Sequence, residues 1–164
     1  MPRIFPRILF FIMAFALMNS VFAQQSVAKH EFNVGFSYMT DFNMGGSGFT
    51  VGYAERAKPW FQVALEFDAN FNLAGTTFDN YSTLGGPRFS LPGKRISPFV
   101  QVMAGASHFR AFGRTGSEFS MKYGGGVDVQ LKHNLLARLE LGDLVIWNPT
   151  THYLQLNTGL VFRF

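Results

Sequence analysis

The sequence contains no cysteine, and charged residues make up only 15% of it. The first absence excludes disulfide bonds, thiolate metal ligands and the acylated cysteine of a lipoprotein. The low charge departs from ordinary soluble domains, in which about 25% of residues are charged. Beyond residue 25 no apolar run reaches the ~20 residues of a membrane-spanning helix, and no long stretch has a helical period. A chain this poor in charge has an unusual surface.

The basic residues are too few and too dispersed to indicate nucleic-acid binding. The formal net charge is +4 and the isoelectric point is near 9.6, but Arg3 and Arg7 belong to the first segment. Without these two, the 14 basic residues fall to 12, against 10 acidic ones, and no basic run exceeds the pair Lys94–Arg95. Nucleic-acid recognition needs a clustered basic face, so we expect no nucleic-acid partner.

Residues 1–23 have the three-part pattern of a secretory signal peptide. A basic start is followed by an apolar stretch over residues 8–17 and by the small residues Val21 and Ala23. The apolar stretch is about half the ~20 residues that a spanning helix needs. We therefore expect cleavage before Gln24, export across the inner membrane, and one domain over residues 24–164. An uncleaved N-terminal anchor is the alternative.

Aromatic residues and glycine are abundant: the chain has 20 phenylalanines and 17 glycines. Past residue 25, bulky apolar residues alternate with small or polar ones, which indicates strands with two unlike faces. Phe32, Val34, Phe36 and Tyr38, for example, alternate with Glu31 and small polar residues. The pattern predicts eight strands of about the length that a tilted membrane strand needs, over residues 30–39, 48–54, 61–70, 81–91, 99–107, 119–131, 135–146 and 153–164.

Two places interrupt this pattern. Pro87, which follows two glycines, cannot donate a hydrogen bond to a neighbouring strand, so we expect a bulge at residues 85–87. Unbroken alternation would also place Asp143 on the apolar face. We therefore expect a bulge or an early strand end at Gly142–Asp143.

The composition of the polar face decides between lipid and water as the surroundings of such a barrel. A soluble barrel of the lipocalin type, the alternative, has its apolar face inside and needs a charged outer face. Here the polar face is mostly Gly, Ser, Thr, Asn, Gln and Ala, which fit the narrow interior of an eight-stranded barrel. We expect the bulky residues, and phenylalanine in particular, to point outward into lipid.

The connections between these strands alternate in length, as do extracellular loops and periplasmic turns. The long ones span residues 40–47, 72–80 and 108–118, and the short ones 55–59, 92–95 and 132–134. An even number of strands then places both termini on the periplasmic side. Four aromatic residues near strand ends are candidates for interfacial girdles: Trp60, Tyr81, Trp147 and Tyr153.

Three segments resemble small outer-membrane β-barrel proteins of the OmpA and OmpX type and the wider porin-like families: residues 85–90, 124–129 and 159–164. The resemblance implies an outer-membrane location in a Gram-negative cell and contact with outer-membrane lipid and lipopolysaccharide. In that family the terminal aromatic residue, with apolar residues at alternate positions before it, resembles the signal for the outer-membrane assembly machinery. Leu156, Leu160, Phe162 and Phe164 match it, whereas Thr158 departs from it. No periplasmic peptidoglycan-binding domain follows, so that function is not expected here.

The polar face contains charges of both signs: Glu31, Glu66, Asp68, Asp128 and Glu140 against Lys122, Arg138, Arg163 and Arg88. In a narrow lumen such charges pair to offset their desolvation, which predicts a plug. The alternative is that they line a narrow pore for ions or small solutes. The sequence therefore favours a structural or surface-interaction protein with a plugged polar lumen.

We expect neither an enzyme nor a metal or cofactor site. Ser107 and His108 are adjacent on one strand and therefore point to opposite faces, and His152 has no neighbouring serine. The histidine–serine–asparagine pattern of lipid A deacylases is missing. A lipid-modifying enzyme is the second alternative.

The long loops contain apolar residues that can present a binding surface to an extracellular ligand or fold over the barrel mouth: Phe42, Met44, Phe78, Phe109 and Phe112. Four basic residues can contact lipopolysaccharide phosphates, although isolated surface bases usually remain solvated: Arg110, Arg114, Lys94 and Arg95.

Overall fold

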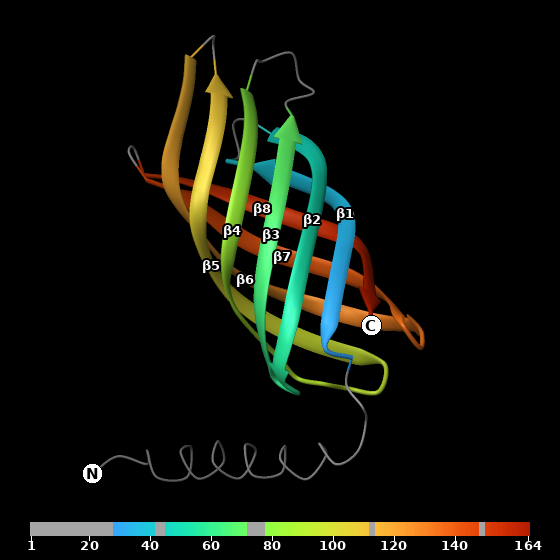
Figure 1. Cartoon of the computed structure of the whole chain (residues 1–164). Helices are drawn as coiled ribbons and strands as arrows, with labels where there is room; N and C mark the ends of the chain where they lie inside the picture. The colour runs from blue at the N-terminus through green and yellow to red at the C-terminus, as the bar shows by residue number, and fades with distance from the viewer. Residues whose placement is uncertain (1–27, 42–44, 72–77, 112–113, 148–149) are drawn as a thin grey trace, which may run out of the picture.

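Eight antiparallel strands make up most of the chain that the structure, a computed structural model, describes, namely residues 28–41, 45–71, 78–111, 114–147 and 150–164. They close into one barrel in which each strand pairs with the next and β1 pairs with β8 (Figure 1). The predicted eight-stranded up-and-down barrel is confirmed. The strands are β1 (His30–Thr40), β2 (Gly45–Lys58), β3 (Phe61–Phe71), β4 (Phe78–Ser90), β5 (Ile96–Ala111), β6 (Arg114–Lys132), β7 (Leu135–Ile146) and β8 (Thr151–Arg163).

The predicted signal peptide, residues 1–23, lies outside the described residues. Within the described ranges, no helix has the length and apolar character needed to cross a membrane.

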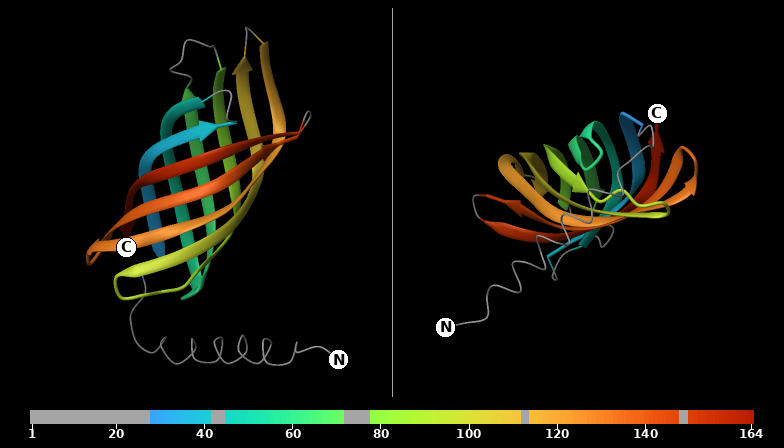
Figure 2. Two further views of the ribbon diagram at one scale, coloured as in Figure 1. Left: turned by 180° about the vertical axis from the view of Figure 1, so that it is seen from behind. Right: turned by 90° about the horizontal axis from the view of Figure 1, so that it is seen from below.

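The two ends of the barrel differ. One end, here called the turn end, holds residue 28, Phe164 and the connections at 59–60, 91–95 and 133–134. The opposite end is called the loop end, and there β5 and β6 continue well past the ends of β7 and β8 (Figure 1). Seen from behind, β7 and β8 cross the barrel at a steep angle to β2 and β3 (Figure 2), as closure of a barrel requires.

The outer wall of the barrel is apolar around its whole circumference. Every strand contributes at least one large exposed hydrophobic side chain, because alternate residues of a strand point to the same face. One example from each strand, in chain order, is Phe36, Phe49, Leu65, Phe89, Val100, Phe119, Leu141 and Leu156. Water does not support so large a continuous apolar surface, so the alternation of the sequence gives an apolar outside and a polar inside.

The bulge expected at residues 85–87 is not present. Gly85 pairs with Ala104 and Arg88 with Gln101, which is three residues further along each strand, so β4 has no inserted residue. A Cβ added to Gly86 would lie 2.1 Å from the carbonyl oxygen of Val102. The glycine thus allows β4 and β5 to approach closely beside the proline. The register shifts in the described barrel occur at the turn end of β2 and β6.

The expected break at Asp143 is also wrong. β7 runs on to Ile146, and Asp143 stays in register with Tyr123 of β6 and Leu154 of β8. Its side chain lies on the outer face, where it accepts a hydrogen bond from the Tyr123 hydroxyl and lies 2.8 Å from His152 Nδ1. Partners on both neighbouring strands satisfy the carboxylate and make the break unnecessary.

The segment 108–118, predicted as a loop, is mostly strand. Arg110 pairs with Thr115 and Phe109 with Gly116, and the ring of Phe109 covers the glycine. β5 and β6 thus form a long hairpin that projects from the loop end. Phe42, Met44 and Phe112 lie outside the described residues, and the Phe78 side chain is not described.

Candidate functional site

The lumen is the main concentration of polar chemistry in the described barrel. All nine charged residues predicted for it, Arg88 included, lie there together with Arg56, which gives five acidic and five basic side chains. Most are almost inaccessible to solvent, and Asp68 is 0% exposed. Arg56 was missed because the predicted strand ended at residue 54, yet it has the same parity as Gly52 and Ala54. Continuing the period by one step would have found it.

The half of the lumen near the turn end is organised around Glu31. Its Oε1 accepts hydrogen bonds from Arg163 Nε at 2.8 Å, from Gln62 Nε2 at 2.9 Å and from Arg56. Its Oε2 lies 3.4 Å from Arg138 Nη2. One carboxylate from β1 therefore joins β2, β3, β7 and β8 across the barrel.

Arg138 also holds Asp128 in a two-pronged contact. Its Nε lies 2.7 Å from Asp128 Oδ1 and its Nη2 lies 2.8 Å from Oδ2. Two parallel hydrogen bonds between a guanidinium and a carboxylate are the strongest form of this pairing. Asp128 and Arg138 are direct register partners on β6 and β7.

The middle of the lumen is organised around the buried ammonium of Lys122. It bonds Glu66, lies 2.8 Å from Glu140 Oε1 and lies 3.8 Å from Asp68 Oδ2. Asn157 donates to Glu66 and Asp68 at 3.4 Å each. This ammonium thus lies within 4 Å of three carboxylates from β3 and β7, and Arg88 Nη2 lies 3.9 Å from Glu66 Oε2.

An aromatic ring connects the two groups of charges. Phe99 points into the lumen, where it is 4% exposed, with the guanidinium carbons of Arg88 and Arg138 at 4.9 and 4.8 Å from its ring centre. Such contacts stabilise guanidinium groups away from water. Phe99 corrects the expectation that every phenylalanine points outward. Arg88 also donates to Gln101, which in turn donates to Glu140.

The lumen also contains a layer of buried apolar side chains. Its residues come from seven of the eight strands: Met39, Ala54, Ala64, Leu84, Met103, Leu144, Ile146 and Tyr153. Tyr153, predicted for the outer girdle, is 7% exposed and points inward, since it has the same parity as Gln155 and Asn157. The other three girdle aromatics, Trp60, Tyr81 and Trp147, are exposed at strand ends as predicted.

A small cavity lies among the described lumen charges. A cavity lined by Asn33, Thr50, Glu66, Arg138 and Asn157 has a volume of ≈ 10 Å³. This is room for about one water molecule.

A larger hollow of ≈ 420 Å³ lies at the loop end, on the projecting sheet of β4, β5 and β6. Its residues are Asp79, Tyr81, His108, Phe109, Arg110, Thr115, Gly116 and Ser117. His108 Nδ1 lies 2.5 Å from Ser117 Oγ on the neighbouring strand, whereas Ser107 points into the lumen and bonds Ser120. The sequence expectation that Ser107 and His108 do not pair is confirmed, but it missed Ser117. The pairing of β5 with β6 brings Ser117 to His108.

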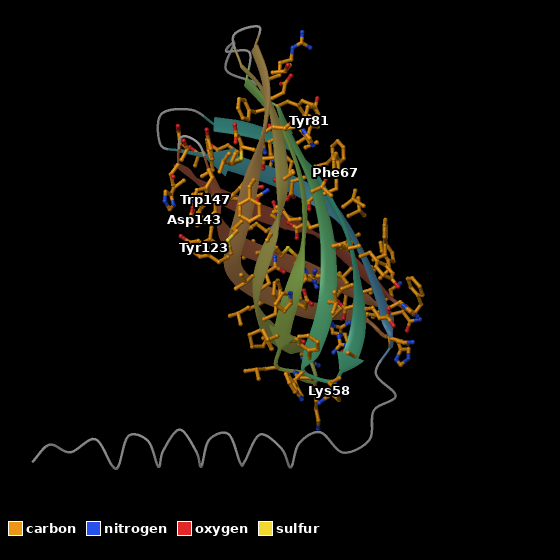
Figure 3. The ribbon with its side chains drawn as sticks, turned by 60° about the vertical axis from the view of Figure 1, so that its left-hand side comes forward. Lys58, Phe67, Tyr81, Tyr123, Asp143 and Trp147 are labelled. Atoms are coloured by element: carbon orange, nitrogen blue, oxygen red, sulfur yellow. The ribbon has the colours of Figure 1, made fainter. Side chains whose placement is uncertain are left out.

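A further polar group lies on the outer face, towards the loop end. Tyr123, Asp143 and His152 meet there, and Trp147 lies nearby (Figure 3). Among the described residues no three His, Asp or Glu side chains are grouped as a metal site would need.

The C-terminal residues of the predicted assembly signal lie on the outer wall. Leu160, Phe162 and Phe164 are exposed, Phe164 to 65%. The backbone of Phe164 exchanges two hydrogen bonds of 3.0 Å with His30, which holds the chain end beside β1.

Comparison with known proteins places this architecture. No family model and no curated protein sequence matches the chain. Among solved structures, the attachment invasion locus protein Ail of Yersinia pestis has 18% identity, covers 84% of this chain and 99% of its own, and has a TM-score of 0.59. Neisserial surface protein A has 11% identity, covers 85% of this chain and 100% of its own, and has a TM-score of 0.67. The N-terminal β-barrel domain of Pseudomonas aeruginosa OprF has 14% identity, covers 84% of this chain and 100% of its own, and has a TM-score of 0.57.

The chain thus has the fold of a small eight-stranded bacterial outer-membrane barrel of the OmpA and OmpX type. The apolar wall is the surface that faces lipid. In this fold the short turns face the periplasm and the longer connections face outward. By this rule the turn end corresponds to the periplasmic end of such barrels, and the loop end to their extracellular end.

Proposed function

We propose that this protein is a non-enzymatic barrel of the outer membrane with a plugged lumen and a surface-interaction role at its extracellular end. Residues 1–23 serve as a cleaved signal peptide and residues 24–164 form the barrel. The observation that supports a plug is the balance of charge inside the lumen, where five basic and five acidic side chains form ion pairs across the barrel.

Opening a continuous path through the lumen would require these ion pairs to separate. Breaking a buried pair leaves an uncompensated charge, which costs about 3–5 kcal/mol. An ion would also have to pass the apolar layer that contains Leu84, Met103 and Leu144. The cavity among the charges, ≈ 10 Å³, is far smaller than a hydrated ion's path needs. Together these features favour a plug over the alternative, a narrow pore.

Planar-bilayer recording tests the plug. The full barrel is expected to give no stable conductance, and the exposed-turn variant Lys94→Gln is expected to behave in the same way. A stable open pore whose ion selectivity changes in Arg138→Ala would establish the alternative, because Arg138 contacts Glu31 and Asp128 inside the lumen.

The extracellular hollow supports the surface-interaction role. The ring of Tyr81 and the polar groups of Asp79, Arg110 and Ser117 are the combination that binds sugars: an apolar face with hydrogen-bonding groups around it. Ail has been solved in complex with the heparin analogue sucrose octasulfate. In this chain four acidic residues outnumber two basic ones at the loop end, which disfavours a polyanion: Asp41, Asp79, Glu118 and Asp143 against Arg110 and Arg114.

We therefore expect this end to bind an uncharged glycan. The test is a glycan array probed with the barrel in nanodiscs. Binding should be lost in Tyr81→Ala and kept in the variant Tyr53→Ala, which changes an exposed tyrosine at the other end. Tight binding of sucrose octasulfate at physiological salt would contradict the preference.

The Ser117–His108 pair is the observation that most favours the enzymatic alternative. A serine nucleophile needs a histidine base that an acid holds in place. His108 meets Ser117 through Nδ1, and among the described side chains no carboxylate is hydrogen-bonded to His108. We expect no labelling of Ser117 by a fluorophosphonate probe and no change in lipopolysaccharide acyl chains when the gene is removed. Labelling that is lost in Ser117→Ala would establish the enzyme.

A further inference from the structure

The charges of the described barrel outside the lumen are divided unequally between its two ends. The turn end carries five basic side chains, here called the basic rim, against one acidic residue, Glu55. The loop end has the opposite sign, with four acidic residues against two basic ones. The members of the basic rim are Lys29, Lys58, Lys94, Arg95 and Lys132.

The basic rim surrounds the barrel. Lys58 is the last residue of β2 and Lys132 the last residue of β6. Lys94 and Arg95 lie in the β4–β5 turn, and Lys29 precedes β1. Each turn at this end therefore has a cation, as does the segment leading into β1. All five residues are exposed, and Lys29 has an acidic partner in Glu55 at 3.2 Å, with both side chains half exposed or more.

The rim lies immediately beyond the apolar wall. Lys58 Nζ is 5.5 Å from the ring centre of Trp60, and that ring stacks on Phe89 at 6.1 Å. Trp60 and Phe89 are both exposed. Figure 3 shows Lys58 at the turn end and Tyr81 near the opposite end of the barrel. An aromatic residue with a lysine next to it marks the depth at which hydrocarbon gives way to headgroups.

We propose that the basic rim binds the headgroups of anionic phospholipids, such as phosphatidylglycerol, in the periplasmic leaflet of the membrane. Lysine and arginine pair with phosphate, and no acid beyond Glu55 opposes them at this end. A periplasmic protein or a cell-wall polymer would contact the turn end along the barrel axis or on one side. Cations placed all around the wall, at headgroup depth, instead match a ligand that surrounds the barrel. The inference needs only a membrane-inserted barrel and is independent of the plug and of the extracellular ligand.

The two tryptophans of the chain allow a test at both ends of the same barrel. Trp147→Phe leaves Trp60 as the fluorophore at the basic rim, and Trp60→Phe leaves Trp147 as the matched fluorophore at the loop end. Each variant is folded into vesicles of phosphatidylcholine containing either brominated phosphatidylglycerol or brominated phosphatidylcholine at equal mole fraction. Because both leaflets of such vesicles have the same lipids, the orientation of insertion does not affect the comparison.

A cation at an anionic surface favours the charged lipid by about fivefold. Brominated phosphatidylglycerol should therefore quench Trp60 with a several-fold higher relative binding constant than brominated phosphatidylcholine. The preference should fall at high salt and be absent at Trp147. It should also disappear in a Trp147→Phe barrel that carries Lys58→Gln, Lys94→Gln, Arg95→Gln and Lys132→Gln, whose folding is checked by gel mobility before and after boiling.

Equal quenching of Trp60 by the two lipids would overturn the proposal and leave the rim available to a periplasmic partner of another kind. A preference that survives the four substitutions would overturn it as well, because it would then come from other groups.

Discussion

At the scale of single residues, the buried charges are the features that constrain this barrel most. The sequence was sufficient to predict nine of the ten, since they share the parity of the small residues of their strands. It did not reveal their partners, because the pairs join strands far apart in the chain, such as Glu31 of β1 and Arg163 of β8. The inward positions of Phe99 and Tyr153 were missed because aromatic residues of such strands normally lie on the outer face. Here Phe99 packs against arginine side chains and Tyr153 against aliphatic ones inside the lumen.

Lys122 offers the sharpest stability test at this scale. Lys122→Met removes the cation that compensates Glu66, Asp68 and Glu140, and three buried carboxylates are then left without it. We expect a loss of about 3–5 kcal/mol in the free energy of unfolding, measured by urea titration in vesicles. Lys132→Met, the same change at the exposed end of the same strand, should stay within about 0.5 kcal/mol. Equal effects of the two variants would contradict the account of the lumen.

Phe164 tests the predicted assembly signal. Phe164→Ala removes an exposed ring from the wall at the chain end, beside β1. We expect several-fold less heat-modifiable barrel in the outer-membrane fraction, while the purified chain still folds in vesicles. Phe119→Ala, which removes an exposed ring nearer the other end, is the control and should assemble normally. Normal assembly of both variants would show that the terminal aromatic residue carries no signal here.

At the scale of strands, alternation predicts the middle of each element better than its ends. The predicted bounds of β3 and β7 agree closely with the structure, whereas β2 runs from Gly45 to Lys58 rather than over residues 48–54. The glycines at its start and the charges at its end have the composition of turns. Strand pairing overrides that composition in β2 and in the β5–β6 hairpin, since each added pair satisfies two backbone groups that a loop would leave to water.

Gly86 tests the close approach of β4 and β5. In Gly86→Ala the new Cβ would meet the carbonyl oxygen of Val102 at 2.1 Å, so the backbone has to shift. We expect a loss of about 1–3 kcal/mol in the free energy of unfolding. At Gly142 the nearest atom to a new Cβ is Lys122 Cγ at 3.3 Å, on a flexible side chain, so Gly142→Ala should cost less. The same urea titration compares the two, and a Gly86→Ala barrel as stable as the parent would contradict the geometry.

At the scale of the whole molecule, the charges fall into three groups. The lumen has five of each sign, the turn end is basic and the loop end is acidic. No local pattern in the sequence predicts this distribution, because it depends on which turns and strand ends meet at which end of the closed barrel. The wall between the two ends is apolar on every strand. The arrangement requires a lipid bilayer around that wall and water at both ends.

Folding of the purified mature chain, residues 24–164, with and without lipid vesicles tests this orientation most directly. Gel mobility before and after boiling, together with sedimentation, reports the folded state in each case. The account predicts a heat-modifiable barrel when vesicles are present and aggregated or unfolded chain in detergent-free buffer without them. A folded, monodisperse protein in lipid-free buffer would contradict it, because the phenylalanines now assigned to the outer wall would then have to form an interior core.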